Sequence, residues 1–241
     1  MKRTRRMAVG TLAVLALCTV AAAPAAQAVK YTGTGCAAVE VISIRGQGEP
    51  AGSGYGGGGY VLGPMQQALE TRLSQTVKLY PLPYSAGQDT LGAANQGIPL
   101  LIDHLVAQRS ACPNQKFVIL GFSLGALVAG EAFTPPSLRY SGVTKYALPT
   151  TVDSKVAAVA IFGDGRFNAS GPEAYGTFVR GLNGQIPRPA DSFSRFNGHI
   201  ANVCNQYDGV CQAISNGQPS AHQDYVKYTD DLVWWVGSLV A

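Results

Sequence analysis

The fold is decided by the stretch Lys116-Phe-Val-Ile-Leu-Gly-Phe-Ser-Leu-Gly-Ala126. Its apolar residues Phe117 to Leu120 predict a short buried strand, and residues 126–132 predict a helix. Between them lies a Gly-x-Ser-x-Gly pattern centred on Ser123, which is typical of a nucleophile elbow on a sharp strand-to-helix turn. Glycines on either side let the backbone segments approach closely. The stretch therefore predicts a nucleophilic serine, and the rest of the chain must supply a base, an acid and an oxyanion hole.

The first 28 residues have the composition of a secretory signal peptide. Basic residues near the N-terminus precede a mostly apolar segment, and Ala26-Gln-Ala28 fits a signal peptidase site. A membrane anchor is the disfavoured alternative, because the apolar segment is short and rich in alanine. We expect residues 29–241 to form a single secreted, extracellular domain, with no later apolar run long enough to span a membrane.

Removal of this segment changes the charge balance. Residues 1–28 hold four of the 18 Lys and Arg and none of the 14 Asp and Glu, which leaves 14 basic and 14 acidic residues. A mature chain without net charge does not favour nucleic acid or an anionic membrane as a partner. The balance is typical of a compact exported enzyme, which we expect to be a monomer.

Four cysteines remain in residues 29–241: Cys36, Cys112, Cys204 and Cys211. An even number in an exported chain predicts two disulfides, and three pairings are possible. A small loop closed by Cys204 and Cys211 would leave Cys36 for Cys112. The spacing and the lack of nearby histidines exclude a zinc site. The glycine-rich stretch 52–60 lacks the Lys-Ser/Thr of a phosphate loop, so no cofactor and no metal are expected.

Strands and helices are predicted to alternate along the chain. Apolar, β-branched runs predict strands at residues 38–44, 77–80, 156–162 and 199–203, in addition to the strand before Ser123. Apolar spacings of three and four predict helices at 63–75, at 91–108 and from 221 onward. Pro99 should bend or split the second helix, and residues 167–189 are expected to be irregular. The order predicts an α/β fold, a three-layer α/β/α sandwich with a mostly parallel central sheet.

The candidate base is a histidine that follows Ser123 in sequence, because this sheet topology uses the order Ser, Asp, His. His104 lies within a predicted helix and is interpreted as a surface residue. His199 lies beside a predicted strand and is interpreted as structural. His222 stands in a late loop before the last helix. We therefore assign the base to His222.

The candidate acid is an aspartate between Ser123 and His222. Four residues qualify by order: Asp153, Asp164, Asp191 and Asp208. Asp164 follows a predicted strand and is the main alternative. Asp208 lies in the Cys204–Cys211 segment, and a closed ring would hold its carboxylate rigidly against the imidazole. Asp208 is therefore the preferred acid.

The oxyanion hole requires two backbone N–H groups aimed at the developing negative charge. One is expected from Leu124, the residue after the nucleophile. The other is expected from the loop after the first strand, at Gln47. Trp234 and Trp235, in the last helix, are interpreted as core packing residues rather than as substrate platforms. Asn168 begins a glycosylation sequon, which matters only in a host that glycosylates.

Taken together, these residues resemble the cutinase and acetylxylan esterase family of secreted serine esterases. The likeness covers nearly all of residues 29–241: Arg-Gly after the first strand, Gly-Phe-Ser-Leu-Gly-Ala, a Cys-x3-Asp-x2-Cys ring and His-x2-Tyr at His222. It implies a small lidless α/β-hydrolase with Ser123, His222 and Asp208 as its catalytic residues. It also implies the bridges Cys36–Cys112 and Cys204–Cys211.

Two positions depart from the cutinase pattern. Gln47 replaces the Ser or Thr that helps to organise the oxyanion hole in many family members, and Gln223 replaces an apolar residue after the catalytic histidine. Gln223 and its polar surroundings look more like the acetylxylan esterase branch. Leu82, Pro83 and Tyr84 are a candidate apolar wall for an acyl chain.

The expected function is that of a secreted carboxylic ester hydrolase. Its substrate would be an ester, either in a cutin-type polyester or with a short-to-medium acyl chain. The alternative is an acetylxylan esterase that deacetylates plant polysaccharide. A non-catalytic surface-binding module on the same fold is a remote third reading.

Overall fold

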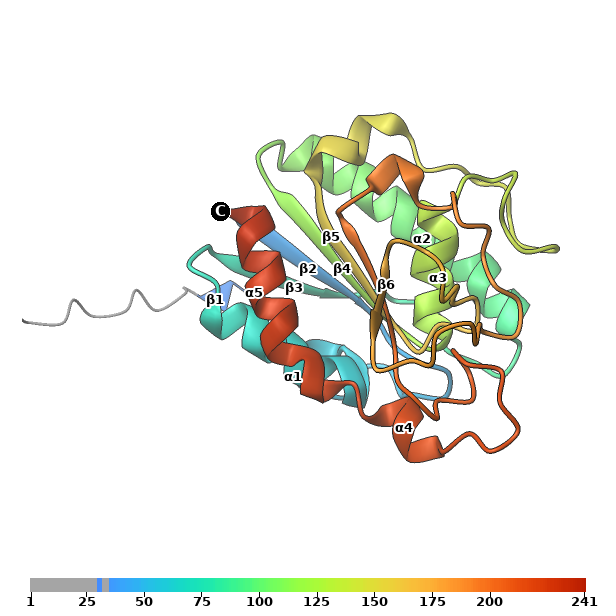
Figure 1. Ribbon diagram of the computed structural model, residues 1–241. Coiled ribbons are helices and arrows are strands. Elements are labelled where there is room, and N and C mark those ends of the chain that lie inside the picture. Colours follow the sequence, from blue (N-terminus) through green and yellow to red (C-terminus); the bar gives the residue numbers. More distant parts are fainter. Residues whose placement is uncertain (1–29, 32–34) are drawn as a thin grey trace, which may run out of the picture.

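The computed structural model describes residues 30–31 and 35–241. The predicted signal peptide and its cleavage site lie outside the described residues. A central sheet runs through the molecule, with helices against both faces (Figure 1). Within the described residues, no helix is both long and apolar enough to cross a membrane.

The sheet contains seven strands in the order β1-β3-β2-β4-β5-β7-β6, and every neighbouring pair is parallel. The strands are β1 (Lys30–Tyr31), β2 (Val39–Ile44), β3 (Val77–Pro81), β4 (Lys116–Phe122), β5 (Val156–Phe162), β6 (Ala174–Gly176) and β7 (Ile200–Cys204). The α-helices are α1 (Gly59–Arg72), α2 (Thr90–Ala111), α3 (Leu124–Phe133), α4 (Pro219–Gln223) and α5 (Thr229–Val240). This is the predicted α/β/α architecture, and the fold prediction is confirmed.

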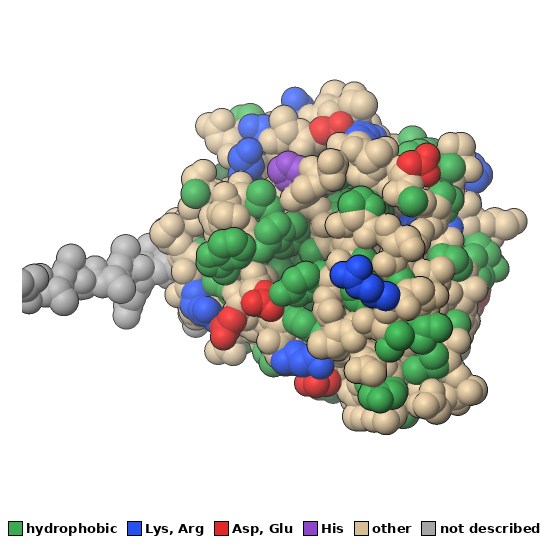
Figure 2. All heavy atoms as spheres, viewed as in Figure 1, with side chains coloured by type: hydrophobic (Ala, Val, Ile, Leu, Met, Phe, Trp, Pro, Cys, Tyr) green, Lys and Arg blue, Asp and Glu red, His purple; other side chains and the backbone are tan. Residues whose placement is uncertain are grey.

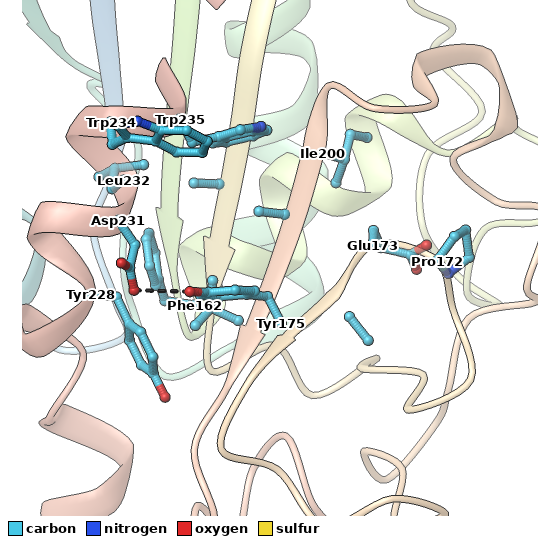
Figure 3. Close-up of a pocket in the computed structure, with 14 residues that line it drawn as sticks. Phe162, Pro172, Glu173, Tyr175, Ile200, Tyr228, Asp231, Leu232, Trp234 and Trp235 are labelled. Carbon is cyan, nitrogen blue, oxygen red and sulfur yellow. Dashed lines mark hydrogen bonds between the residues drawn. The ribbon is translucent and has the colours of Figure 1, made fainter. Parts of the chain in front are cut away.

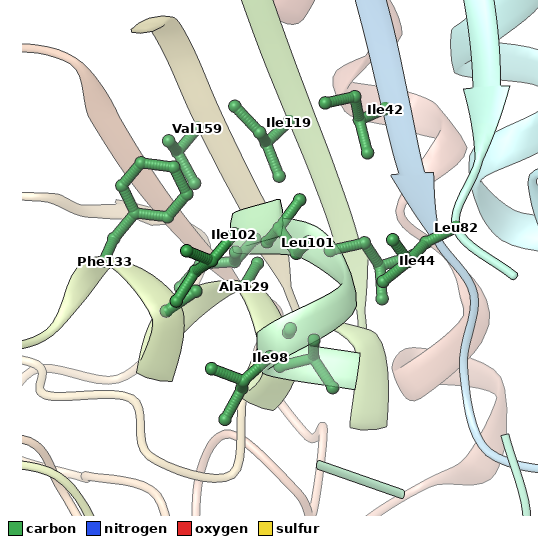
Figure 4. Close-up of a cluster of buried hydrophobic side chains, with 14 of the residues drawn as sticks. Ile42, Ile44, Leu82, Ile98, Leu101, Ile102, Ile119, Ala129, Phe133 and Val159 are labelled. Atoms are coloured by element: carbon green, nitrogen blue, oxygen red, sulfur yellow. The ribbon is translucent and has the colours of Figure 1, made fainter. Parts of the chain in front are cut away.

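Alternation along the central strands divides the apolar core between the two faces of the sheet. In β4, Phe117 and Ile119 belong to the core shared with α2 and α3, whereas Val118 and Leu120 belong to the core shared with α1 and α5. Figure 4 shows the first of these cores, with side chains from the sheet meeting those of α2 and α3. Because both faces are covered, the central strands read as continuous apolar runs.

Three sequence expectations need correction. Helix α2 is not split at Pro99, because a proline removes only one backbone hydrogen bond while Ile98, Leu101 and Leu105 remain fully buried beside it. The segment 167–189 is not wholly irregular, since it contains β6, which pairs with β7. The C-terminal helix is broken into α4, a 3-10 turn at Val226–Tyr228 and α5.

The direction in which the chain adds strands to the sheet reverses beside β4. From β2 the chain crosses to β3 on one side and then returns to β4 on the other. The carboxyl ends of β2 and β4 are therefore neighbours, and Ile44 of β2 pairs with Gly121 of β4. Open α/β sheets bind ligands at such a switch point. Ser123 and Gln47 follow these two strands and lie at this edge of the sheet.

Candidate active site

Ser123 lies on a strained turn between β4 and α3. Its φ of 53° and ψ of −114° are unusual for a residue with a side chain. Such a conformation costs of order 1–3 kcal/mol and persists only where surrounding contacts impose it. One of these contacts is the hydrogen bond from the Ser123 N–H to the carbonyl of Phe162, at 2.9 Å.

The two glycines of the elbow are required sterically, as the sequence predicts. A Cβ on Gly121 would lie 2.5 Å from the carbonyl oxygen of Gly125. A Cβ on Gly125 would lie 1.8 Å from the carbonyl oxygen of Ile44, at the end of β2. The elbow therefore packs directly against the strand that leads into the predicted oxyanion loop.

The imidazole of His222 connects Ser123 to Asp208. Its Nε2 lies 2.9 Å from the Ser123 Oγ, and its Nδ1 lies 3.0 and 2.9 Å from the two carboxylate oxygens of Asp208. The ring also packs on Phe122, with 5.0 Å between ring centroids. The structure thus brings together the three side chains that were predicted from segments far apart in the sequence.

Asp208 is fully buried within a disulfide ring. Cys204 and Cys211 are bridged, and so are Cys36 and Cys112. One Asp208 oxygen accepts the Val210 N–H at 2.8 Å, and the other accepts the Tyr225 hydroxyl. Burial alone would raise the pKa of the Asp208 carboxyl, but the hydrogen bond and charge of His222, with the Tyr225 hydroxyl and the Val210 N–H, hold it below its ordinary value.

Two residues that support this arrangement were not assigned such roles from the sequence. Tyr225 is fully buried and donates to Asp208, although its spacing indicated only a core position. The Asn205 side chain donates to the carbonyls of Ala221 and Asp224, at 2.8 and 3.1 Å, and so holds the segment that carries His222. The one sequence signal for this role is that Asn205 directly follows Cys204. A polar side chain at the start of the ring can hydrogen-bond to the segment that carries the histidine.

Asp164, the alternative acid, is occupied elsewhere. Its carboxylate accepts hydrogen bonds from the Arg188 guanidinium and from the side-chain amide of Asn202, the latter at 3.2 Å. Arg188 and Arg166 both contact Glu131 of α3, at 3.2 and 2.6 Å. These four charged side chains form a buried, electrically balanced cluster. Its geometry ties the segment after β5 to α3 and leaves Asp164 with cationic rather than imidazole partners.

The loop predicted to supply an oxyanion donor is held firmly. The Arg45 guanidinium donates to the carbonyls of Glu49 and Tyr84, at 2.8 and 2.7 Å. The Glu49 carboxylate accepts the N–H of Gly46 at 2.6 Å. The side-chain amide of Gln47 donates to the carbonyls at positions 87 and 88, each at 3.1 Å. The Gln47 side chain therefore braces the neighbouring loop, which leaves its backbone N–H as the candidate donor.

The candidate apolar wall is mostly absent. Leu82 belongs to the buried core, and Tyr84 is 3% exposed, with its hydroxyl donating to the carbonyl of Arg45. The Tyr84 side chain therefore supports the loop that is predicted to supply the oxyanion donor. Gln223, next to His222, is exposed. Leu82 and Tyr84 therefore do not offer an acyl chain an exposed apolar surface, and the residue beside His222 is polar.

The other two histidines have structural contacts. His104 is not a free surface residue as predicted, because it stacks on Tyr80 at 3.6 Å and its Nε2 lies 3.1 Å from the buried carboxylate of Glu40. His199 Nδ1 lies 2.9 Å from the Ala157 carbonyl, in keeping with its structural interpretation. Among residues 30–31 and 35–241, no cluster of His, Cys, Asp and Glu is arranged to hold a metal ion.

The parallel sheet, its flanking helices and the serine at the strand switch define the chain as an α/β-hydrolase. Solved structures support this class. The catalytic core of the acetyl xylan esterase from Trichoderma reesei has a TM-score of 0.71 at 20% identity and covers 85% of this chain and 99% of its own. Trichoderma reesei cutinase has a TM-score of 0.59 at 23% identity and covers 86% and 78%.

The sequence comparisons define the family. Residues 35–240 match the family described as Cutinase, and the chain belongs to that family. A relative named Phospholipase Culp4, from Mycobacterium tuberculosis, is 31% identical over 223 residues, which covers 92% of this chain and 84% of the relative. Membership of this family makes the chain a serine esterase, and the suspected family resemblance is confirmed.

Proposed function

We propose that the chain is a carboxylic ester hydrolase that acts through an acyl-enzyme on Ser123, with His222 as base and Asp208 as the orienting acid. The observation that carries this proposal is the continuous chain of contacts from the Ser123 Oγ through both imidazole nitrogens to Asp208. A serine hydroxyl needs such a base because it is a weak nucleophile while it retains its proton.

In the first half of the reaction, the Ser123 Oγ attacks the ester carbonyl while His222 Nε2 takes its proton. Asp208 keeps the proton on Nδ1 and stabilises the imidazolium that forms. The oxyanion of the tetrahedral intermediate accepts hydrogen bonds from the backbone N–H groups of Leu124 and Gln47. Leu124 is the first residue of α3, whose N-terminal N–H groups lack partners within the helix and favour negative charge.

The second half of the reaction repeats these roles with water. The intermediate collapses, the alcohol leaves with the proton from His222, and the acyl group remains on Ser123. His222 then takes a proton from water, whose oxygen attacks the acyl carbon. Collapse of the second intermediate releases the carboxylic acid and returns the proton to Ser123.

A Ser123→Ala variant tests the reaction. Hydrolysis of p-nitrophenyl acetate should fall by at least about a thousandfold, because only oxyanion stabilisation and binding remain. A serine-reactive phosphonate should label the wild type once and the variant not at all. Wild-type rates in the variant would contradict the role of Ser123 and would leave room for the non-catalytic reading.

We further propose a substrate from one of two classes. Cutin-type polyesters and esters with a short-to-medium acyl chain are supported by the family and by the relative named as a phospholipase. Acetylated polysaccharide is the alternative, favoured by the polar Gln223 and by the burial of Leu82 and Tyr84. Rates on p-nitrophenyl esters from acetyl to dodecanoyl separate them, since a sharp acetyl preference would argue against cutin.

We also propose that residues 1–28 are removed on export and that residues 29–241 act as one secreted, monomeric domain. Charge composition and the two disulfides support this proposal. Mass spectrometry of the protein recovered from culture medium should show an N-terminus at residue 29. A cell-retained protein of full length would contradict it.

A further inference from the structure

A second groove lies between α5 and the end strands β6 and β7, with a volume of about 330 Å³. None of Ser123, His222 and Asp208 is among its lining residues. The floor is low because Ala160 and Ala201 contribute small side chains, and because β6 is only three residues long. Figure 2 shows apolar side chains gathered on this face of the molecule, with both acidic and basic side chains close by.

Aromatic side chains form the sides of this groove. In Figure 3, Trp235 and Tyr175 lie on opposite sides of the groove, and Trp234 stands beside Trp235. Trp234 is 77% exposed and Tyr175 is 46% exposed. The expectation that Trp234 packs in the core is therefore wrong. Exposed aromatic rings beside a groove are typical of a binding site.

The charged groups of the groove are hydrogen-bond acceptors. Asp231 accepts the Tyr175 hydroxyl at 2.9 Å. One carboxylate oxygen of Glu173 is buried and has no hydrogen-bond partner among the described residues, and burial raises the pKa of this carboxyl. Lys, Arg and His are absent from the described residues that line the groove. A ligand that donates hydrogen bonds would pair with the exposed carboxylate of Asp231, whereas an anionic one would be repelled.

We infer that this groove binds a sugar ring of a polysaccharide chain. The C–H faces of such a ring are apolar and fit against flat aromatic side chains, and its hydroxyls donate to carboxylates. A fatty acid brings its carboxylate toward Asp231, and no cation lines the groove to offset it. A purely apolar ligand would cover the carboxylate of Asp231 and offer it no hydrogen bond.

The groove would act as an anchor on a polymer. Binding at a second site on the same chain raises the effective concentration of the polymer around the esterase without any new contact at Ser123. This inference goes beyond the proposed ester hydrolysis and does not depend on the roles of Ser123, His222 and Asp208. Hydrolysis of a small soluble ester would therefore be unaffected by changes in the groove.

The test measures binding of the full mature chain to insoluble xylan, with the Ser123→Ala background used to prevent turnover. Trp234→Ala should weaken binding about tenfold, the size expected for loss of one stacked aromatic. Asp231→Ala should also weaken binding, because it removes the exposed carboxylate that would accept hydrogen bonds from the sugar. Tyr146→Ala is the matched control, because Tyr146 is 46% exposed and is not among the groove residues.

In a chain that retains Ser123, Trp234→Ala and Asp231→Ala should keep their p-nitrophenyl acetate rates within about twofold, which shows that the fold survives. Quenching of Trp fluorescence by xylo-oligosaccharides gives an independent measure in solution. The inference is overturned if the parent protein binds no polysaccharide, or if the Trp234 and Tyr146 variants bind equally well. Binding of phosphatidylcholine vesicles in place of xylan would also overturn it.

Discussion

Asp164 and Asp208 follow neighbouring strands, β5 and β7, and both side chains are completely buried. Asp208 faces His222, a neutral or cationic partner that can exchange a proton. Asp164 faces Arg188, whose guanidinium has only hydrogen-bond donors and cannot act as a base. Two carboxylates at equivalent places in a sheet can thus serve different purposes, and the partner decides which.

The two aspartate regions also meet at the imidazole. Gly163, which precedes Asp164, has a φ of 64°, and a Cβ there would lie 2.8 Å from the Cε1 of His222. The Asp164 segment therefore limits the position of the ring by contact, while Asp208 binds it directly. The ion pairs among Asp164, Arg166, Arg188 and Glu131 hold the Gly163–Asp164 segment in place.

The largest effect is expected for Asp208→Asn. The substitution keeps the shape but removes the acceptor that fixes the imidazole tautomer, so kcat on p-nitrophenyl acetate should fall by about ten-thousandfold. Circular dichroism should show a folded protein. A loss of less than tenfold would remove Asp208 from the proposed mechanism and return Asp164 to consideration.

The matched variant, Asp164→Asn, should show the opposite pattern. It leaves Arg188 buried without its carboxylate, which should lower the free energy of unfolding by about 3–5 kcal/mol. Urea denaturation measures this loss. Activity per folded molecule should stay within about tenfold of wild type, and an activity loss as large as that of Asp208→Asn would show that the two carboxylates are not distinct.

Opening the ring around Asp208 should have a smaller effect. In a Cys204→Ser/Cys211→Ser variant, the chain-entropy model predicts a loss of about 2.5 kcal/mol in unfolding free energy. Activity should also fall, because Asp208 then reaches His222 from a more mobile loop. Cys36→Ser/Cys112→Ser is the control, with a stability loss but little change in activity. Full activity in the open-ring variant would show that the ring does not orient the acid.

Tyr225→Phe sharpens the account of Asp208. Loss of the hydroxyl removes one hydrogen bond to a charged acceptor, worth about 1.5–3 kcal/mol. The negative charge of the carboxylate is then less neutralised by hydrogen bonds, so it stabilises the imidazolium form of His222 more strongly. We expect kcat to fall about tenfold and the acid limb of the kcat/KM profile to move to higher pH. A lower rate with an unchanged pH profile would indicate packing damage alone.

The smallest expected effect is on stability in acid. The folded-state pKa of Asp208 lies below its ordinary value of about 3.9, so its ionised form stabilises the fold above that pH. This contribution is lost as the pH falls from about 4 toward the lower folded-state pKa. Unfolding free energy measured between pH 5 and 2 should therefore decline less steeply in Asp208→Asn than in wild type. Equal slopes would contradict the hydrogen bonding described for Asp208.

Much of the fold could be predicted because β4, β5 and α3 are long apolar runs with clear ends. The misses came from weak or contradictory local signals. Three residues of β6 lie in a segment rich in glycine and proline, and pairing with β7 is what makes them a strand. Pro99 predicts a break that the buried side of α2 prevents. Trp234 lies in an apolar stretch of the last helix yet faces solvent.

The sequence by itself determined the elbow at Ser123, the order of serine, aspartate and histidine, and the alternation that makes a parallel sheet. These depend on local backbone chemistry and on periodicity, which short segments carry. Only the tertiary structure decided the contact of Tyr225 with Asp208, the contact of Arg188 with Asp164, the bracing role of Gln47 and the groove beside Trp234. Those depend on which strands become neighbours, and a partner from a distant segment leaves no mark in the local sequence.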